Sequence, residues 1–432
     1  MGASLSTISN VLKNFYLGPV RDQLNSKVLA LQLLQVETEN LEGLLAVLPL
    51  HTSRSGGVGA RAELGVLPTA GNQVYAQATY DLKYHYGRVQ VSGQAIAKSA
   101  SDAGSFLRAM KAELDMIKDD LAIDFARQVY GPGTGVIEVC GTSGPSTTIT
   151  LATAEAIKKG FLYIGALIDV SVIATGAPVA NGNAVQISAV NAATPSITVV
   201  QVGAGGSGSV TVTAANAIYR AGNVTNGPVV NEMDAGLQKI LPAAANTLGN
   251  INAASAGNEY WDNLRDTTGG AITLNGATSP LMVNLNRAIS AGADDLISVT
   301  TPGIVRRLFG SADFTGLSGA QTATNVRFVN TKAFAGGFST ISFDVGSGPV
   351  VLASDRHAPW GKVFIIDRNH IKLFSPADWD FMQRDGLTIR SMGSGASAVD
   401  AYEAVLFRYA NMGSDRRNSS VGISGVTDQD GN

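Results

Sequence analysis

The sequence predicts an α+β fold in which an N-terminal arm, a long β-hairpin and a long helix precede a mixed region with a small β-rich insertion. Three observations carry this prediction. Apolar and polar side chains alternate along residues 74–86, as in a long strand. Residues 101–130 place apolar side chains every three or four positions, as in an amphipathic helix. Residues 161–230 contain only two charged side chains, and their short apolar runs between turn signals predict closely spaced strands.

The composition is poor in charge. Charged residues make up 15% of the 432-residue chain, against roughly 25% in an ordinary soluble protein, which leaves an ordinary apolar share of 45%. Charged groups are depleted at the cores of protein interfaces, so this composition favours a protein that packs against copies of itself. A secreted, weakly charged β-protein is the alternative. The net charge of −3 argues against a sequence-reading nucleic-acid binder, which needs a basic face, but allows loose enclosure of nucleic acid.

No chemical site is evident in the sequence, and we expect neither an enzyme nor a cofactor-binding protein. Cys140 is the only cysteine, which argues against a disulfide framework or a thiolate metal site. The four histidines lack ligand spacing, and the glycine pattern at 203, 205 and 208 precedes a β-run instead of a helix. No apolar run reaches the roughly 18 residues of a membrane span, and the N-terminus lacks a signal-peptide pattern. A soluble intracellular protein is the expectation.

Residues 1–50 are expected to form an N-terminal arm that carries short helices. One apolar stripe at helical spacing consists of Leu24, Val28, Leu31 and Leu34. A second stripe, stopped at Pro49, consists of Leu41, Leu44, Leu45 and Leu48. Both stripes suit a helix packed on its own domain equally well as an arm that reaches a neighbouring subunit.

Residues 51–95 are predicted to form an extended β-hairpin loop. Glycine recurs between residues 53 and 73, which indicates a flexible excursion, and Arg54 and Arg61 lie within it. The strand that follows places on one face Val74, Ala76, Ala78, Tyr80, Leu82, Tyr84 and Tyr86. The pattern shifts at Gly87, where we expect a bulge. Because a projecting strand exposes its edge, the hairpin is expected to need a neighbouring subunit to cover it.

A peripheral domain at residues 96–144 is predicted around one long helix. Residues 99–102 offer its N-terminal cap and Gly-Pro-Gly at 131–133 ends it, so at 1.5 Å per residue it would be about 45 Å long. Charged residues are expected to cover its other faces. The apolar positions, which we interpret as a packing seam, are Leu107, Met110, Leu114, Ile117, Leu121 and Phe125.

Residues 145–228 are predicted to be an inserted β-rich domain, a small sandwich or barrel. Its expected strands lie near residues 169–173, 184–190, 196–202 and 210–213.

Residues 229–375 are expected to alternate helices and strands in a further domain, and residues 376–432 to return to the peripheral domain. The expected helices are 232–240, 280–291 and 301–308, and the expected strands are 296–299, 326–329, 350–353, 363–366 and 371–374. Residues 350–374 are interpreted as one β-hairpin, and residues 387–392 and 399–409 as a second. The polar, Gly-rich chain from Ser414 is expected to be a frayed or arm-like tail, and its Arg416–Arg417 pair makes no basic stripe.

The order of these elements resembles the Hong Kong 97-type major capsid proteins of tailed bacteriophages. The Gly-rich hairpin at residues 52–92 looks like that family's extended loop, and the helix at 101–130 looks like its spine helix. LMVNLNRAISAGADDLISVTTPGIVRRLFG (281–310) resembles the helix, strand and helix of its axial domain. VVLASDRHAPWGKVFIID (350–367) and AYEAVLFRYANMGSDRR (401–417) resemble its closing strands. The resemblance covers most of the chain outside residues 145–228.

This resemblance implies a virion protein whose hexamers and pentamers close into an icosahedral shell around double-stranded DNA, assembled in the host cytoplasm. It also implies a scaffolding protein, a portal, a maturation protease and a decoration or cement protein as partners, without a membrane or sequence-specific DNA binding. The extended hairpin, which is expected to need a neighbouring subunit, is consistent with the contacts between subunits that close a shell. The residues expected to contribute to assembly are Tyr80, Leu82, Lys83, Tyr84, Tyr86, Arg54, Arg61, Leu107, Met110, Leu114, Ile117, Leu121, Arg416 and Arg417.

Some members of this family cross-link their subunits through a lysine on the extended loop and an asparagine on a neighbour. Here Lys83 is the only lysine between His51 and Ala97, and it lies in the strand instead of the Gly-rich tip. We therefore expect no covalent cross-link. The arm is too short for a built-in scaffolding domain, which indicates a separate scaffolding protein.

Two other protein classes compete with this interpretation. An encapsulin-type shell for protein cargo has the same fold but would normally lack the long N-terminal arm and the β-rich insertion. A secreted β-rich adhesin or surface-layer protein would explain the Gly, Thr and Asn content but not the long helix.

Overall fold

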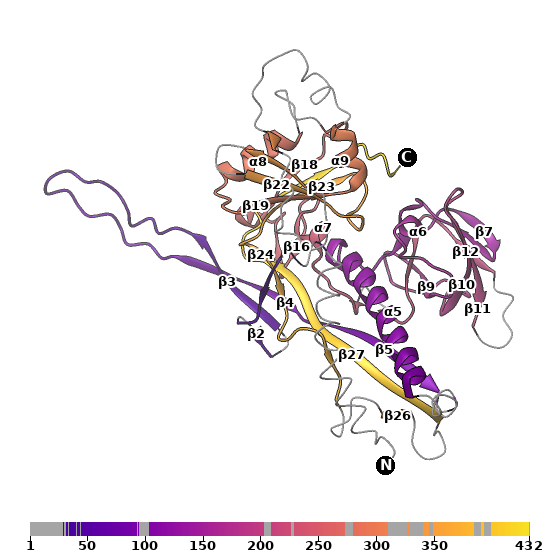
Figure 1. Cartoon of the computed structure of the whole chain (residues 1–432). Helices are drawn as coiled ribbons and strands as arrows, with labels where there is room; N and C mark the ends of the chain where they lie inside the picture. Colours follow the sequence, from indigo (N-terminus) through magenta and orange to yellow (C-terminus); the bar gives the residue numbers. More distant parts are fainter. Residues whose placement is uncertain are drawn as a thin grey trace.

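The computed structural model describes residues 29, 32, 34–39, 41–43, 45–92, 94, 103–202, 209–225, 229–272, 280–309, 326–327, 340–344, 349–383, 390–392 and 399–431. These residues form a seven-stranded sheet, a second sheet crossed by a long helix, a separate β-rich module and a hairpin that projects away from the rest (Figure 1). Most of the first predicted stripe, including Leu24, Val28 and Leu31, lies outside the described residues.

The seven-stranded sheet combines strands between residues 264 and 367 with one strand near the C-terminus. Its strands, in spatial order, are β18 (Leu264–Asp266), β28 (Val421–Ser424), β23 (Lys362–Asp367), β19 (Leu296–Thr300), β22 (Pro349–Ser354), β21 (Thr340–Asp344) and β20 (Val326–Arg327). The predicted hairpin at 350–374 is wrong, because β19 lies between β22 and β23 and pairs with both.

Both faces of the central strand β23 are buried. Along β23, Val363 and Ile365 join the core beneath α8 (Pro280–Ser290) and α9 (Pro302–Phe309), whereas Phe364 and Ile366 join the large central core. A continuous apolar run therefore suits this strand, since no face of it meets water. The expected frayed tail is wrong over β28. This strand lies between β18 and β23, and its Val421 and Ile423 are buried in the core beneath α8 and α9.

The second sheet is organised around one strand of 16 residues, β27 (Val399–Ser414). It pairs antiparallel with β5 (Lys83–Ser92), the predicted hairpin partner β26 (Arg390–Met392), β25 (Asp380–Phe381) and β24 (Ile371–Phe374). Beyond β24, β1 (Gln35–Glu37) of the N-terminal arm adds a parallel edge strand. The first and last fifths of the chain thus share one sheet.

The predicted long helix is confirmed as α5 (Ala103–Tyr130), 28 residues or about 42 Å long. Its C-terminal half packs on β5 and the central core through Ala122, Phe125, Ala126 and Val129. Ile117 and Leu121 lie so close to Gly87 that a Cβ there would overlap Leu121. Lys118 is buried, contrary to the expected fully charged outer faces. The side chains of Leu107, Met110 and Leu114 lie outside the described ones.

The projecting hairpin begins earlier than predicted. β3 (Leu45–Ser53) pairs with β4 (Val74–Asp81), and the short β2 (Leu41–Glu42) extends the same sheet. The second predicted helical stripe is therefore wrong, because Leu41 lies in β2, and Leu45, Leu48 and Pro49 lie in β3. Leu44 lies outside the described residues.

The predicted change of phase exists, but it falls between Leu82 and Lys83 instead of at Gly87. Ala78, Tyr80 and Leu82 are buried, after which the inward positions are His85, Gly87 and Val89. The chain leaves the β3–β4 sheet at this point and joins β27, and its pairing with β27 continues through Gly87 without a shift. Gly87 serves the close approach of α5 and forms no bulge.

The inserted β-rich module is present and has its own core. A six-stranded sheet runs in the order β6 (Glu138–Val139), β13 (Asn216–Arg220), β9 (Leu167–Val172), β10 (Val185–Asn191), β11 (Ser196–Gln201) and β8 (Thr148–Thr150). Beside it lie β7 (Ser143–Ser146), β12 (Val210–Val212) and the short helix α6 (Glu155–Lys158). The sheet includes Glu138, upstream of the expected boundary at 145.

Short elements connect the module to the rest of the fold. They are β14 (Val224–Thr225), β15 (Val229–Val230), α7 (Leu237–Ile240), β16 (Thr247–Leu248), β17 (Ile251–Asn252) and a 3-10 turn at Glu259–Trp261. The predicted helix at 232–240 is helical only over α7. Upstream of it, the Met233 amide donates to Gln128 Oε1 and Gly236 packs against the backbone of Gly131, which fixes this segment against α5.

Candidate assembly surfaces

The tip of the hairpin exposes a cluster of aliphatic side chains, here called the loop tip. Val58, Leu64, Val66 and Leu67 are 80–102% exposed. Hydrogen bonds within residues 54–73 hold the loop, including Ser55 Oγ to Gly71 O at 2.9 Å and Arg61 Nε to Val66 O at 2.9 Å. Exposed apolar side chains are unfavourably hydrated, and their burial against another protein lowers the free energy. The loop tip therefore suits contact with another chain.

The predicted assembly residues at the base of the hairpin separate into two groups. Tyr80 and Leu82 are buried, and the Tyr80 hydroxyl donates to Ser414 O at 2.8 Å, so both stabilise the subunit itself and are not surface contacts. Burial raises the pKa of Tyr80. Tyr84 and Tyr86 are 45% and 51% exposed on the outer side of β5, and Lys83 is half-buried opposite Ala410 of β27.

Tyr84 and Tyr86 belong to a larger surface that the sequence analysis missed. Phe407 lies opposite Tyr86 and Tyr409 opposite Tyr84 on β27, and the four side chains form what we call the outer aromatic face. The rings of Tyr84 and Tyr409 meet edge to face at 4.9 Å between centroids. Period-two alternation within residues 399–414 was the available signal, since Phe407 and Tyr409 occupy the same face of one strand.

Arg417 is a core residue, which corrects the expectation that the Arg416–Arg417 pair lies in an accessible tail. Arg417 donates from Nε to Ile240 O at 2.8 Å and from Nη2 to Asn246 Oδ1 at 2.8 Å, and its guanidinium lies 5.9 Å from the centre of the Trp261 ring. Burial lowers the pKa of Arg417 to about 10.

Arg416 closes the C-terminal end of helix α8. It donates to the carbonyl oxygens of Ala291 and Gly292, and from Nε to Asn418 Oδ1 at 3.0 Å. A cation at this end of a helix is favoured by the helix dipole. The assembly roles of Arg416, Arg54, Arg61 and Lys83 stay predictions.

A partly buried charge cluster joins α5 to the inserted module. Asp124 accepts from Gln128 Nε2 at 2.8 Å and forms ion pairs with Arg127 at 3.1 Å and with Arg220 of β13 at 3.3 Å, while Arg127 also pairs with Glu232. Burial pushes the pKa of Asp124 upward, but the charges of Arg127 and Arg220 outweigh it and hold the pKa below its ordinary value. A cavity of about 350 Å³ beside this cluster reaches Tyr84 and Tyr86. The cluster fixes one side of the module against the helix.

His85 faces inward beneath α5 and predicts a specific pH dependence. Its ring meets Phe125 edge to face at 5.0 Å, near the charges of Asp124, Arg408 and Arg127, and burial lowers the pKa of His85 from its ordinary 6.5 to about 4. The unfolded chain therefore binds a proton between these values that the folded chain does not bind. We expect His85 to lower the free energy of unfolding by about 3 kcal/mol as the pH falls from 6.5 to 4.

Urea denaturation of unassembled subunits across this pH range, compared between the parent and His85→Gln, measures this contribution. Carboxylates also titrate in this pH range. The informative quantity is therefore the difference in the free energy of unfolding between the two proteins. His51→Gln, in the exposed hairpin, is the matched control. Equal acid destabilisation of the parent and His85→Gln would contradict the assignment.

The described residues show neither a metal site nor a membrane-spanning helix. No three His, Cys, Asp or Glu side chains gather within this part of the chain where they could hold a metal ion. None of the helices over the same residues combines the length and apolarity needed to cross a bilayer.

Comparison with known proteins gives structural likenesses at low sequence identity. No protein-family model and no curated protein sequence matches the chain. The similar structures include capsids and an encapsulin complex. The cyanophage A-1(L) capsid asymmetric unit has a TM-score of 0.47 and 14% identity over 94% of this chain and 93% of that one.

Two further likenesses have similar values. The capsid of a native GTA particle has a TM-score of 0.42 and 13% identity over 93% of this chain and 91% of that one. The holo-SrpI encapsulin complex of Synechococcus elongatus PCC 7942 has a TM-score of 0.44 and 9% identity over 92% and 86%. At TM-scores below 0.5 these likenesses do not assign the chain to a family, so a functional conclusion has to rest on the chain's own architecture.

Proposed function

We propose that this chain is a major capsid protein that assembles into hexamers and pentamers of a closed icosahedral shell around double-stranded DNA. The observation that carries the proposal is the projecting hairpin, whose apolar loop tip lies far from the body of its own subunit (Figure 1). In a monomer the apolar side chains of such an arm would stay exposed to water. In a subunit of a shell they can be buried against a neighbouring subunit.

The arrangement behind the hairpin supports the same function. The 28-residue helix α5 packs along β5, which continues from the hairpin and pairs with β27, while the seven-stranded sheet forms a second compact unit. Extended subunits of this kind make several separate contacts with neighbours, as a closed lattice requires. The net charge of −3 suits a wall that does not adhere to packaged DNA.

The predicted division of the chain is retained as part of this proposal. Residues 1–50 would be the N-terminal arm, 51–95 the extended loop, 96–144 and 376–432 the peripheral domain, 145–228 the insertion and 229–375 the axial domain. Within it, α5 would serve as the spine helix. Two features modify the division: the hairpin starts at Leu45, and β28 joins the sheet of the proposed axial domain.

The partners of the proposed shell are a separate scaffolding protein, a portal, a maturation protease and a decoration protein, with assembly in the host cytoplasm. The scaffolding protein is the partner most open to test, because co-expression can supply or withhold it. An assembly yield that no co-expressed viral protein alters would contradict it.

Electron microscopy of the fast-sedimenting fraction tests the central proposal. The chain is expressed alone and then together with its neighbouring genes, and regular closed shells are expected in at least one case. Nucleic acid inside shells purified from infected cells supports the viral role, whereas protein cargo would support an encapsulin. Dispersed monomers under both conditions would contradict the proposal.

We expect mature particles to show no covalent cross-links between subunits. Lys83, the only lysine of the extended loop, is half-buried in β5 and paired with β27, about as far from the loop tip as the hairpin allows. A denaturing gel of boiled mature particles should show one band of the capsid protein, at the mass of a single subunit, and none at multiples of that mass. A ladder of higher-mass species that Lys83→Arg removes would contradict this expectation.

A further inference from the structure

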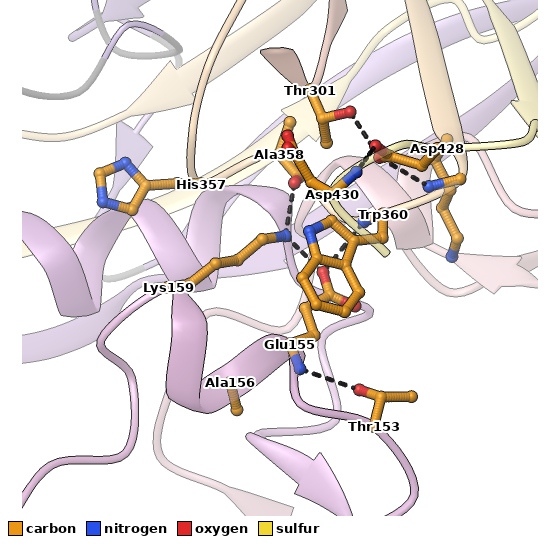
Figure 2. A network of polar contacts seen from close by, with 12 residues as sticks. Thr153, Glu155, Ala156, Lys159, Thr301, His357, Ala358, Trp360, Asp428 and Asp430 are labelled. Carbon is orange, nitrogen blue, oxygen red and sulfur yellow. Dashed lines mark hydrogen bonds and ion pairs between the residues drawn. The ribbon is translucent and has the colours of Figure 1, made fainter. Parts of the chain in front are cut away.

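Residues 426–431, the last that the structure describes, follow an ordered path that we call the C-terminal strap. After β28, the Val426 amide donates to Gly361 O at 3.0 Å and the Thr427 amide to Gly270 O at 2.8 Å. The strap then passes the start of α9 and the loop around Trp360 and ends beside α6 of the inserted module (Figures 1 and 2). The strap therefore contacts both the seven-stranded sheet and the inserted module, which lie far apart in the sequence.

One half of the strap is anchored to the seven-stranded sheet and its helices. Asp428 accepts from Thr301 Oγ1 at 2.5 Å and from the Gly361 amide at 3.4 Å, at the N-terminal end of α9 where a carboxylate is favoured. Asp430 forms an ion pair with Arg306 of the same helix. Gly303 makes this approach possible, because a Cβ there would overlap Asp428 Oδ1 and lie 2.7 Å from the Asp430 amide.

The other half of the strap meets the inserted module. Lys158 of α6 donates from Nζ to Asp430 O at 3.4 Å and lies 5.1 Å from the centre of the Trp360 ring. Gly431 lies against the same ring, where a Cβ would be 3.4 Å from Trp360 Cε3. Strap, tryptophan and α6 thus form one packed joint.

A buried polar contact continues this joint beneath Trp360. Lys159 is 5% exposed, donates from Nζ to Ala358 O at 2.5 Å and pairs with Glu155. Glu155 in turn accepts from the Trp360 amide at 3.0 Å, and the contacts converge from α6, the Trp360 loop and the strap (Figure 2). Burial lowers the pKa of Lys159, and its pairing with Glu155 opposes that shift.

We propose that the C-terminal strap is a clamp that holds the inserted module in one orientation against the seven-stranded sheet. The chain enters the module after α5 and leaves it through Arg220, and the Asp124 cluster joins the module to α5 on that side. The joint at α6 is a second attachment made only by side chains and the strap. Opening the strap uncovers this joint, and the module is then held at the Asp124 cluster and by the contacts of Glu155 and Lys159 with the Trp360 loop. This inference stands independently of the proposed shell.

Gly303→Ala is the sharpest test, because it removes no residue of the strap. Alanine raises helix propensity in α9 by roughly 1 kcal/mol relative to glycine, so the helix itself should persist. The added methyl group displaces Asp428 and with it the strap. Gly144→Ala, in the module and with open space at its Cβ, is the matched control. Lys158→Met together with Arg306→Gln weakens the strap by a second, independent route.

The readout is the distance between spin labels at Ala189→Cys in the module and Asp294→Cys beside α8, both exposed, in a Cys140→Ala background. Labelled chains are diluted with unlabelled chains so that only distances within one subunit are measured. The parent and Gly144→Ala should give one narrow distribution, and Gly303→Ala and the double variant a broadened or shifted one. A narrow parental distribution in both strap variants, with circular dichroism unchanged, would overturn the proposal.

Discussion

Replacing residues 57–69 by a short glycine-serine turn should abolish the assembly of closed shells while the subunit stays folded. The replaced segment contains the whole loop tip but leaves β3, β4 and the Ser55–Gly71 hydrogen bond in place. Because its apolar side chains are exposed and its hydrogen bonds are local, the isolated subunit loses little by the change. Sedimentation and electron microscopy measure assembly, and circular dichroism measures folding.

A finer variant separates the apolar contacts from the length of the arm. Val58→Ser, Leu64→Ser, Val66→Ser and Leu67→Ser together keep the hairpin and remove only the apolar tip, and we expect a loss of shells close to that of the replacement. Ile164→Ser with Val200→Ser, on the exposed surface of the inserted module, is the control for a general loss of apolar surface. Normal shells from the loop replacement would refute the role assigned to the hairpin.

Arg417→Met should lower the free energy of unfolding by about 3 kcal/mol. The guanidinium satisfies Ile240 O and Asn246 Oδ1 in a site without exposed surface, and methionine leaves both acceptors without that donor at a cost of roughly 1–3 kcal/mol each. The methionine side chain recovers part of this loss by packing against Trp261. Chemical denaturation of unassembled subunits measures the difference.

Arg356→Met is the matched control for Arg417→Met, because Arg356 is exposed and the same charge is removed. We expect a change within about 0.5 kcal/mol there. Arg417→Lys should recover little stability, since one ammonium cannot reproduce the planar fork that reaches both acceptors. Equal stability of Arg417→Met and Arg356→Met would show that the buried network contributes nothing.

Local patterns in the sequence were sufficient for the long helix, the hairpin and the inserted module. Each depends on a period or a turn signal that neighbouring residues already contain. The same alternation was misleading for Tyr84 and Tyr86, because its phase changes between Leu82 and Lys83. There the chain leaves β3 and pairs with β27, more than 300 residues away in the sequence.

The polar tail shows a different limit of reasoning from composition. Ser419 and Ser420 are fully buried, and Arg417 is buried with them. Polar residues indicated an exposed tail only because their hydrogen-bond partners, such as Ile240 O and Asp367 N, come from distant segments. The strap was missed for the same reason, because nothing near Asp428 or Asp430 in the sequence points to α9 or α6.

The position of β27 also determines when this protein can fold. Its partner β5 leaves the ribosome more than 300 residues before β27 does, and β23 has to wait for β28. Until synthesis ends, β5 presents an unpaired edge on the growing chain, which is a hazard for aggregation. With so many contacts between distant segments, folding is expected to be slow and to occur after translation. The folding of the finished chain would therefore limit the supply of subunits to the proposed shell.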